Sequence, residues 1–128
     1  MRLSDPNFSS KHVVLVDDDP LVLSALERQI KRLGCQTVSF NDPLHALTEK
    51  GNDSSVHLLI TDMHMPAMTG RALAQQMQIR NPTLRVIYVS GCQPDSLAEQ
   101  RLLNPFDHFL MKPFSFELLK TVLLDIFG

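Results

Sequence analysis

The segment Leu58–Gly70 has the sequence LLITDMHMPAMTG, in which four apolar or β-branched residues lead directly into an aspartate. A short apolar run that ends at turn-forming residues, here Pro66 and Gly70, is typical of a buried strand in a parallel sheet. Asp62 therefore stands where a buried strand ends and a loop begins. Ligands and chemistry gather at this edge of open α/β sheets, although a lone carboxylate there fits a simple helix cap equally well.

Hydrophobic periodicity divides the rest of the chain into alternating strands and helices. Strands are indicated at residues 13–16, 35–40, 56–61, 84–89 and 107–111, and helices at residues 20–33, 43–50, 70–80, 95–103 and 115–126. Short connections between strand–helix pairs predict an α/β fold. We expect a flavodoxin-like, doubly wound (βα)5 domain with a five-stranded parallel sheet in the order 2-1-3-4-5 and helices on both faces.

Two of the predicted helices begin with the same local signal. Asp19-Pro20 and Asp42-Pro43 each place a capping carboxylate before a proline at the first helical position. Asp19 is therefore assigned to capping, while its neighbours Asp17 and Asp18 remain available for other roles.

The length of 128 residues suits one domain with a real core. Residues 1–10 are polar and lack the apolar core of a signal peptide, so we expect a disordered lead-in followed by one domain over residues 11–128. The formal charge of −2 includes no basic stripe, so direct binding to nucleic acid or to a membrane is not expected. No apolar run reaches the roughly 18 residues of a membrane span.

The two cysteines, Cys35 and Cys92, do not make a disulfide framework, which favours a reducing, cytoplasmic location. They fall at opposite ends of the predicted sheet. Since a five-residue strand spans roughly 16 Å, far more than a disulfide allows, an intramolecular bond between them is excluded.

The predicted strand order makes the first and third strands neighbours, so Asp17, Asp18 and Asp62 meet at one edge. Like charges this close raise one another's pKa, and a cation relieves the repulsion. Oxygen ligands at an open edge suit Mg²⁺, with the backbone carbonyl of His64 as a further ligand and its side chain in solvent. Ser90 and Lys112, which end the fourth and fifth strands, complete a pocket for a tetrahedral dianion in which Asp62 could accept phosphate.

Four stretches in this order, VLVDDDP, TDMHMPAMTG, VIYVSG and FLMKPF, resemble the receiver (CheY-like) domain of two-component response regulators. The resemblance covers residues 11–127, and the sequence around residues 90–114 is most similar to receivers of hybrid sensor histidine kinases. It implies that Asp62 is the phosphoacceptor and that Asp18 binds Mg²⁺ directly, with Asp17 acting mainly through water. It also implies that Ser90 and Lys112 bind the phosphoryl group, and that Ser90 and Phe109 form the switch.

As a receiver, the chain would accept a phosphoryl group from a histidine kinase or a histidine phosphotransfer protein, with at most weak autophosphatase activity. Two alternatives remain. Asp17 and Asp19 form the Asp-x-Asp of haloacid-dehalogenase phosphatases, although Leu21 replaces the threonine that those enzymes carry two residues later. A degenerate receiver would act only as a protein-binding module.

The last predicted helix has more apolar residues than one sheet face needs. A stripe at helical spacing is expected to face the sheet, namely Phe116, Leu119, Val122, Leu123 and Ile126. Leu118, Leu124 and Phe127 are left over, which predicts a contact surface. The family resemblance places the output face on helix 4, strand 5 and helix 5, so we expect phosphorylation to change association there, including possible homodimers.

Overall fold

The computed structural model describes residues 8–91 and 106–128. Its strands are β1 His12–Val16, β2 Gln36–Phe40, β3 Leu58–Asp62, β4 Arg85–Ser90 and β5 His108–Met111. Its helices are η1 Phe8–Ser10, α1 Pro20–Arg32, α2 Pro43–Lys50, α3 Gly70–Arg80 and α5 Phe116–Phe127. The helix expected over residues 95–103 lies outside the described residues, as does Cys92.

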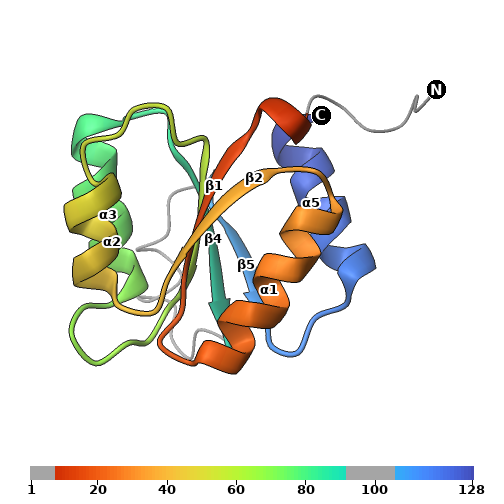
Figure 1. Ribbon diagram of the computed structural model, residues 1–128, viewed down its shortest axis with the longest axis horizontal. Helices are drawn as coiled ribbons and strands as arrows, with labels where there is room; N and C mark the ends of the chain where they lie inside the picture. The colour runs from red at the N-terminus through yellow and green to blue at the C-terminus, as the bar shows by residue number, and fades with distance from the viewer. Residues whose placement is uncertain (1–7, 92–105) are drawn as a thin grey trace.

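The five strands form one parallel sheet in the order β2-β1-β3-β4-β5, which confirms the predicted topology. Helices α1 and α5 cover one face, and α2 and α3 cover the other (Figure 1). Strand β3 lies in the middle between β1 and β4, and all five of its residues are buried. Strand β2 lies at one edge of the sheet, next to β1.

Both aspartate–proline signals start helices as expected. The Asp19 carboxylate accepts a hydrogen bond from the Leu21 amide at 2.9 Å, and the Asp42 carboxylate accepts one from the Leu44 amide at 3.0 Å. Because the Asp19 carboxylate caps α1, it is not available as the second carboxylate of a phosphatase Asp-x-Asp pair with Asp17. This argues against the phosphatase alternative.

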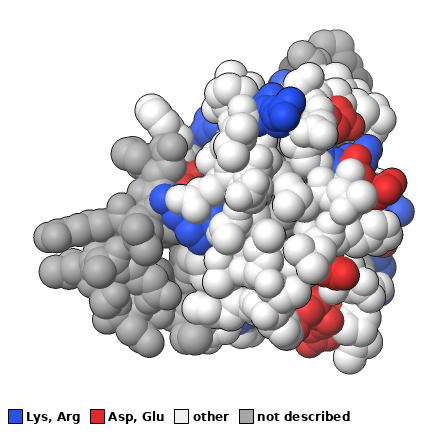
Figure 2. All heavy atoms as spheres, turned by 90° about the vertical axis from the view of Figure 1, so that its left-hand side faces the viewer, with Lys and Arg blue, Asp and Glu red and all other residues white. Residues whose placement is uncertain are grey.

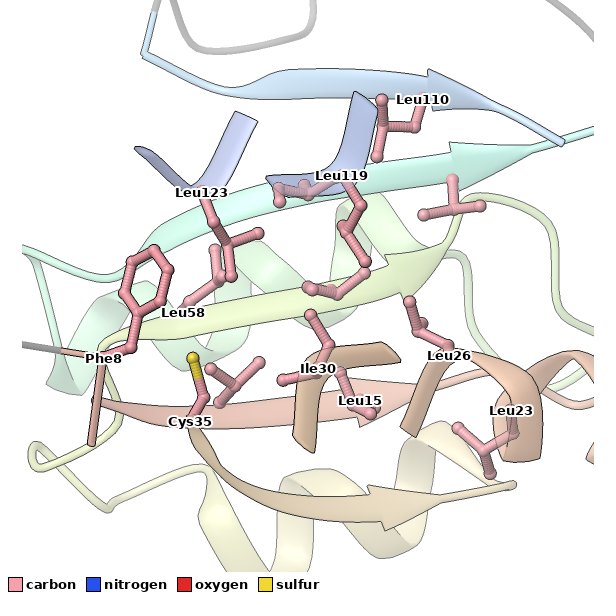
Figure 3. Close-up of a cluster of buried hydrophobic side chains, with 14 residues drawn as sticks. Phe8, Leu15, Leu23, Leu26, Ile30, Cys35, Leu58, Leu110, Leu119 and Leu123 are labelled. Atoms are coloured by element: carbon pink, nitrogen blue, oxygen red, sulfur yellow. The ribbon is translucent and has the colours of Figure 1, made fainter. Parts of the chain in front are cut away.

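Each face of the sheet carries its own apolar core. Under α1 and α5, inward side chains such as Leu15, Ile60, Leu119 and Leu123 are completely buried (Figure 3). Under α2 and α3, the second core includes Leu59, Leu73, Met77 and Tyr88. Strand residues alternate between the two cores because successive side chains point to opposite faces.

The expectation of a disordered lead-in over residues 1–10 is wrong at its C-terminal end. Phe8–Ser10 form a 3₁₀ helix, and the Phe8 side chain is 2% exposed within the first core (Figure 3). Its ring meets that of Phe127 edge-to-face at 6.1 Å. The folded unit therefore includes Phe8, which closes the core between the end of α5 and Cys35.

Fewer α5 residues are left over than the sequence suggested. Leu124 and Phe127 pack against the first core, and Lys11 lies over the Phe127 ring at 5.2 Å. Only Leu118 of the three surplus residues is strongly exposed, at 45%. The prediction was therefore wrong for Leu124 and Phe127, and Phe127 contacts Phe8 in a segment that was expected to be disordered.

Cys35 is buried and free, and burial raises the pKa of its thiol to about 11. A thiol with such a pKa is almost entirely protonated near neutral pH, so Cys35 is a packing residue rather than a reactive one. The α2–α3 side of the molecule shows scattered charges and no continuous basic patch over its described residues (Figure 2). None of the described helices is long and apolar enough to cross a bilayer.

The amino ends of the strands carry a pair of histidines. The His12 amide donates to Nδ1 of His57 at 3.0 Å, which requires a neutral imidazole. Burial, with help from Lys11 and His12, lowers the pKa of His57. Below about pH 6.5 the unfolded chain therefore binds more protons at His57 than the folded protein does. The stabilising contribution of neutral His57 is complete above that pH and is lost as the pH falls through the folded-state pKa.

We expect a His57→Asn protein to lose part of the fall in unfolding free energy that the wild type shows below about pH 6.5. The asparagine oxygen can still accept from the His12 amide but does not titrate. Urea unfolding between pH 7.5 and 5 measures the difference, which amounts to less than one proton bound on unfolding. His45→Asn, at an exposed histidine, is the control. Parallel pH profiles for wild type and His57→Asn would contradict the assignment.

Candidate functional site

The site is built around Asp62, the last residue of β3. Its side chain is at the carboxyl edge of the sheet, and the residue is 9% exposed. Within the sheet Asp62 is paired with Val89 of β4, and the next amide, that of Met63, donates to the Val89 carbonyl at 2.9 Å. These contacts fix the backbone on which the carboxylate stands.

Asp17 and Asp18 follow β1, the neighbour of β3, and reach the same edge. Asp17 is 1% exposed, and its Oδ1 accepts from the Asp19 amide at 2.9 Å. Asp18 is exposed. Each of the three aspartates offers one oxygen, and these oxygens all lie within 4.8 Å of one another. The structure therefore brings together the acidic cluster that the sequence predicted.

Lys112 enters this cluster from the end of β5. Its Nζ donates to Asp17 Oδ2 at 2.9 Å and lies 3.7 Å from Asp62 Oδ1. Burial and the Asp17 carboxylate raise the pKa of Asp62, and Lys112 opposes this change. One ammonium thus serves two buried carboxylates, so negative charge remains in excess at the site.

The donor set fits a small divalent cation. An octahedral Mg²⁺ with bonds of about 2.1 Å needs oxygen ligands roughly 3–4 Å apart, and the three aspartate oxygens lie within 4.8 Å of one another. Both Asp17 oxygens already accept hydrogen bonds, from Lys112 and from the Asp19 amide, whereas Asp18 is exposed. This geometry favours Asp18 and Asp62 as direct ligands.

His64 contributes its backbone rather than its side chain to the contacts at Asp62. Its amide donates to Asp62 Oδ1 at 3.4 Å, a long hydrogen bond, while the residue is exposed as expected. Its carbonyl as a metal ligand stays a prediction. Among the described residues, the three aspartates are the one group of three or more acidic, histidine or cysteine side chains close enough to share an ion.

Ser90 and Phe109 are on the strands beyond Asp62. Ser90 is 1% exposed at the end of β4, and its carbonyl accepts from the Lys112 amide at 2.7 Å. Phe109 is half-buried in β5, where it is paired with Tyr88 and packs on the second core. The structure thus places every predicted site residue on the β1, β3, β4 and β5 strands or directly after them.

Two features of this region were not predicted from the sequence. Gly70 was interpreted only as a chain break, yet a Cβ atom there would lie 2.2 Å from the Asp62 carbonyl oxygen. Arg71 was not singled out, although its Nη1 lies 4.0 Å from Asp107 Oδ2. The glycine that follows the loop after Asp62 is a sequence signal for the close approach of Gly70. No local sequence pattern indicates the ion pair between Arg71 and Asp107, because the two residues are far apart in the chain.

Comparison with known proteins gives a consistent result. The chain matches the response regulator receiver domain family over residues 13–124. It is 30% identical over 119 residues to the transcriptional regulatory protein MalR of Bacillus subtilis, covering 89% of this chain and 49% of that protein. It is 31% identical over 114 residues to the sensor histidine kinase RcsC of Salmonella typhimurium, covering 87% of this chain and 12% of that protein. The chain thus spans about half of the first relative and far less of the second.

Solved structures show the same fold. A CheY-like receiver domain protein from Methanospirillum hungatei superimposes with a TM-score of 0.77 at 25% identity, covering 90% of this chain and 94% of that one. The CheX–CheY–BeF3–Mg²⁺ complex from Borrelia burgdorferi gives a TM-score of 0.80 at 20% identity, covering 92% and 90%.

The match to the receiver family spans β1 through most of α5, and therefore includes β1, β3 and β5, the three strands that supply the acidic pocket and its lysine. Receiver domains are signalling domains that bind Mg²⁺ at such a pocket and interact with histidine kinases or phosphotransfer partners. With sequence, fold and acidic pocket in agreement, this chain belongs to the response regulator receiver domain family of two-component systems.

Proposed function

We propose that this domain accepts a phosphoryl group from a phosphohistidine donor onto Asp62. The observation that carries the proposal is the placement of Lys112 Nζ between the Asp17 and Asp62 carboxylates, 2.9 Å and 3.7 Å away. An Asp62 oxygen would attack phosphorus, forming a P–O bond as the P–N bond to the donor imidazole breaks. The imidazole nitrogen keeps the electron pair and takes a proton.

The surrounding residues have separate tasks in this reaction. Asp62 would be the nucleophile, and Lys112 can move toward the incoming phosphoryl oxygens. Ser90 would bind another of those oxygens. The His64 amide donates a hydrogen bond to Asp62 Oδ1 and so helps to orient this carboxylate. Mg²⁺, held by Asp18 and Asp62, by Asp17 through water and by the His64 carbonyl, would supply positive charge against the phosphoryl group.

Acetyl phosphate tests this proposal directly. Wild-type protein is expected to take up a hydroxylamine-sensitive phosphoryl group only when Mg²⁺ is present, and Asp62→Asn is expected to lose at least about 99% of it, since no nucleophile remains. Asp42→Asn is the matched control, because asparagine caps a helix as well as aspartate does. Undiminished labelling of Asp62→Asn would overturn the assignment. No labelling of wild type would favour a degenerate receiver, and turnover of phosphomonoesters would favour a phosphatase.

We propose that the donor docks on α1 and on the loop after β5. These elements line a groove of about 200 Å³ next to Lys112, formed by Val22, Ala25, Leu26, Gln29, Pro113 and Phe114. Leu21, at the start of α1, is 81% exposed. An apolar groove that reaches Lys112, with an exposed leucine next in sequence to its lining residue Val22, suits a helical protein partner that brings its phosphohistidine to Asp62.

A Leu21→Ala protein should therefore react with a phosphohistidine protein about 5- to 30-fold more slowly than wild type, the range of a moderate interface residue. Its reaction with acetyl phosphate should not change, because no partner surface is involved. Leu44→Ala is the control, since Leu44 occupies the same position after an Asp-Pro cap on α2 and is 48% exposed. Equal transfer rates for both variants would remove Leu21 from the docking surface.

Output is proposed to leave through β5 and α5, together with the segment that precedes β5. Met111 of β5 and Leu118 of α5 are 40% and 45% exposed, and they remain available for contact with a partner or with a second copy of the domain. Phe109 and Ser90 would form the switch between Asp62 and this face. Because Phe109 lacks a hydroxyl, its movement would depend on packing alone.

A further inference from the structure

Three polar side chains from separate elements meet on the α2–α3 side of the sheet, outside the acidic pocket. They are Arg71 in the first turn of α3, Tyr88 in β4 and Asp107 just before β5. Arg71 Nη1 lies 4.0 Å from Asp107 Oδ2, and the Tyr88 phenol is near enough to both side chains for their charges to act on its pKa. The side chain of Asp107 is 4% exposed, and Tyr88 is completely buried.

Burial makes these contacts consequential. A buried phenol and a nearly buried carboxylate are costly unless they have partners. Arg71 provides both with a partner, and its Nε is itself buried without a hydrogen bond in the part of the chain that the structure describes. Burial raises the pKa of Tyr88, and Arg71 opposes that rise. A single arginine therefore ties α3 to β4 and to the start of β5.

The position of Arg71 in the chain connects this group to the phosphoacceptor. Gly70 directly precedes Arg71, and it packs so closely on Asp62 that a Cβ atom would lie 2.2 Å from the Asp62 carbonyl oxygen. The Gly70 amide also donates to the Met63 carbonyl at 3.0 Å. A shift of the backbone at Asp62 would therefore press on the first turn of α3.

The other end of the group leads to the proposed switch residue. Tyr88 is paired with Phe109 across β4 and β5, and both pack in the second core. Asp107 is two residues before Phe109. These contacts link Asp62 through Gly70, Arg71 and Asp107 to the segment just before β5, separately from Ser90.

We propose that Arg71, Tyr88 and Asp107 form a latch that holds β5 and Phe109 against α3 before phosphorylation, and that changes at Asp62 reach β5 by moving Arg71. The transmission of changes from Asp62 to β5 rests on the proposed function. The hold of the latch on β5 concerns the resting protein and can be tested alone. The three side chains of the latch lie outside the acidic pocket. The latch would therefore regulate the domain without taking part in phosphoryl transfer.

Amide hydrogen exchange of residues 108–111 tests the latch, with and without beryllofluoride and Mg²⁺. In the resting state, Tyr88→Phe and Arg71→Gln should exchange at least about threefold faster than wild type, because β5 opens more often once its tie is cut. On addition of beryllofluoride they should show less than about half of the wild-type change. Their labelling by acetyl phosphate should stay within about twofold of wild type, since the acidic pocket is intact.

Arg85→Gln is the matched control. Its guanidinium lies 5.9 Å from the Phe106 ring centre, and its Nη2 donates to the Phe106 carbonyl at 3.2 Å, so it holds the same segment without touching Tyr88. This variant should keep the full response of residues 108–111. Tyr88→Phe preserves the aromatic ring in the core, so it remains informative if Arg71→Gln does not fold.

The outcomes separate the two proposals. If Tyr88→Phe and folded Arg71→Gln exchange and respond as wild type does, the latch does not exist. If wild type is labelled at Asp62 but residues 108–111 do not respond to beryllofluoride, the latch does not transmit the signal and the inference fails. If wild type is not labelled at all, the proposed function fails, while faster resting exchange in both variants still supports the latch as a structural tie.

Discussion

A Gly70→Ala protein is expected to lose both stability and phosphoryl acceptance. The added methyl carbon would lie 2.2 Å from the Asp62 carbonyl oxygen and 3.0 Å from Thr61 Cγ2. Neither backbone can withdraw freely, because β3 is hydrogen-bonded on both sides and fully buried. Overpacking of this kind costs about 1–3 kcal/mol or more of unfolding free energy.

The functional loss follows from the same contact. The methyl group pushes against the residue whose carboxylate would attack phosphorus, and misplacement of a reacting group by about 1 Å can slow a reaction by about 100-fold. We therefore expect labelling by acetyl phosphate to fall at least about tenfold under conditions in which the variant is folded. Urea unfolding and the rate of labelling measure the two effects.

Gly91→Ala is the control for this experiment. Gly91 follows β4 at the same edge of the sheet, but a Cβ atom there would have no neighbour within 4 Å among the residues that the structure describes. It should therefore match wild type in both measurements. If Gly70→Ala behaved like Gly91→Ala, the close approach of α3 to Asp62 would not be needed for the function, and the route from Asp62 to Arg71 would also lose its basis.

A Phe8→Ala protein should be less stable than wild type by about 3–5 kcal/mol, as for other large-to-small changes of buried aromatic residues. Phe8 is 2% exposed and packs with Phe127, Cys35 and the other residues of the first core. The loss is a large share of the roughly 5–15 kcal/mol that stabilises a typical domain. Urea unfolding monitored by circular dichroism gives the difference in unfolding free energy.

Phe106→Ala is the matched control, because Phe106 is also near a strand but is 70% exposed. Its stability should change by no more than about 0.5 kcal/mol. Phe8→Leu should fall between the two, since it keeps most of the buried volume. If Phe8→Ala were as stable as Phe106→Ala, Phe8 would not contribute to the core, and residues 8–10 would be a lead-in to the folded domain.

The receiver interpretation makes sense of the excess negative charge at the carboxyl edge. Three carboxylates gather there and Lys112 contacts two of them, Asp17 and Asp62, which is unfavourable unless a cation compensates. Mg²⁺ would compensate the excess negative charge of the site. Lys112 would remain near Asp17 and Asp62 until a phosphoryl group arrives. A merely structural site would be expected to balance these charges within the protein.

Local sequence was sufficient to predict most of the architecture. Apolar runs, Asp-Pro caps and glycine or proline breaks act within a few residues, so they mark where strands and helices begin and end. Parallel connection rules then order the strands. Because parallel strands end at a common edge, the order alone brings Asp17, Asp18, Asp62 and Lys112 together, as observed.

Tertiary structure alone decided which distant side chains become partners. The Lys112–Asp17 bond joins residues 95 positions apart, Arg71 reaches Asp107, and Phe8 covers the Phe127 ring. Such pairs depend on strand register, helix crossing and side-chain length together, and none of these leaves a pattern within a short window of sequence. For this protein the sequence determined where the carboxylates gather, and the packing of α3, β4 and β5 determined what else they touch.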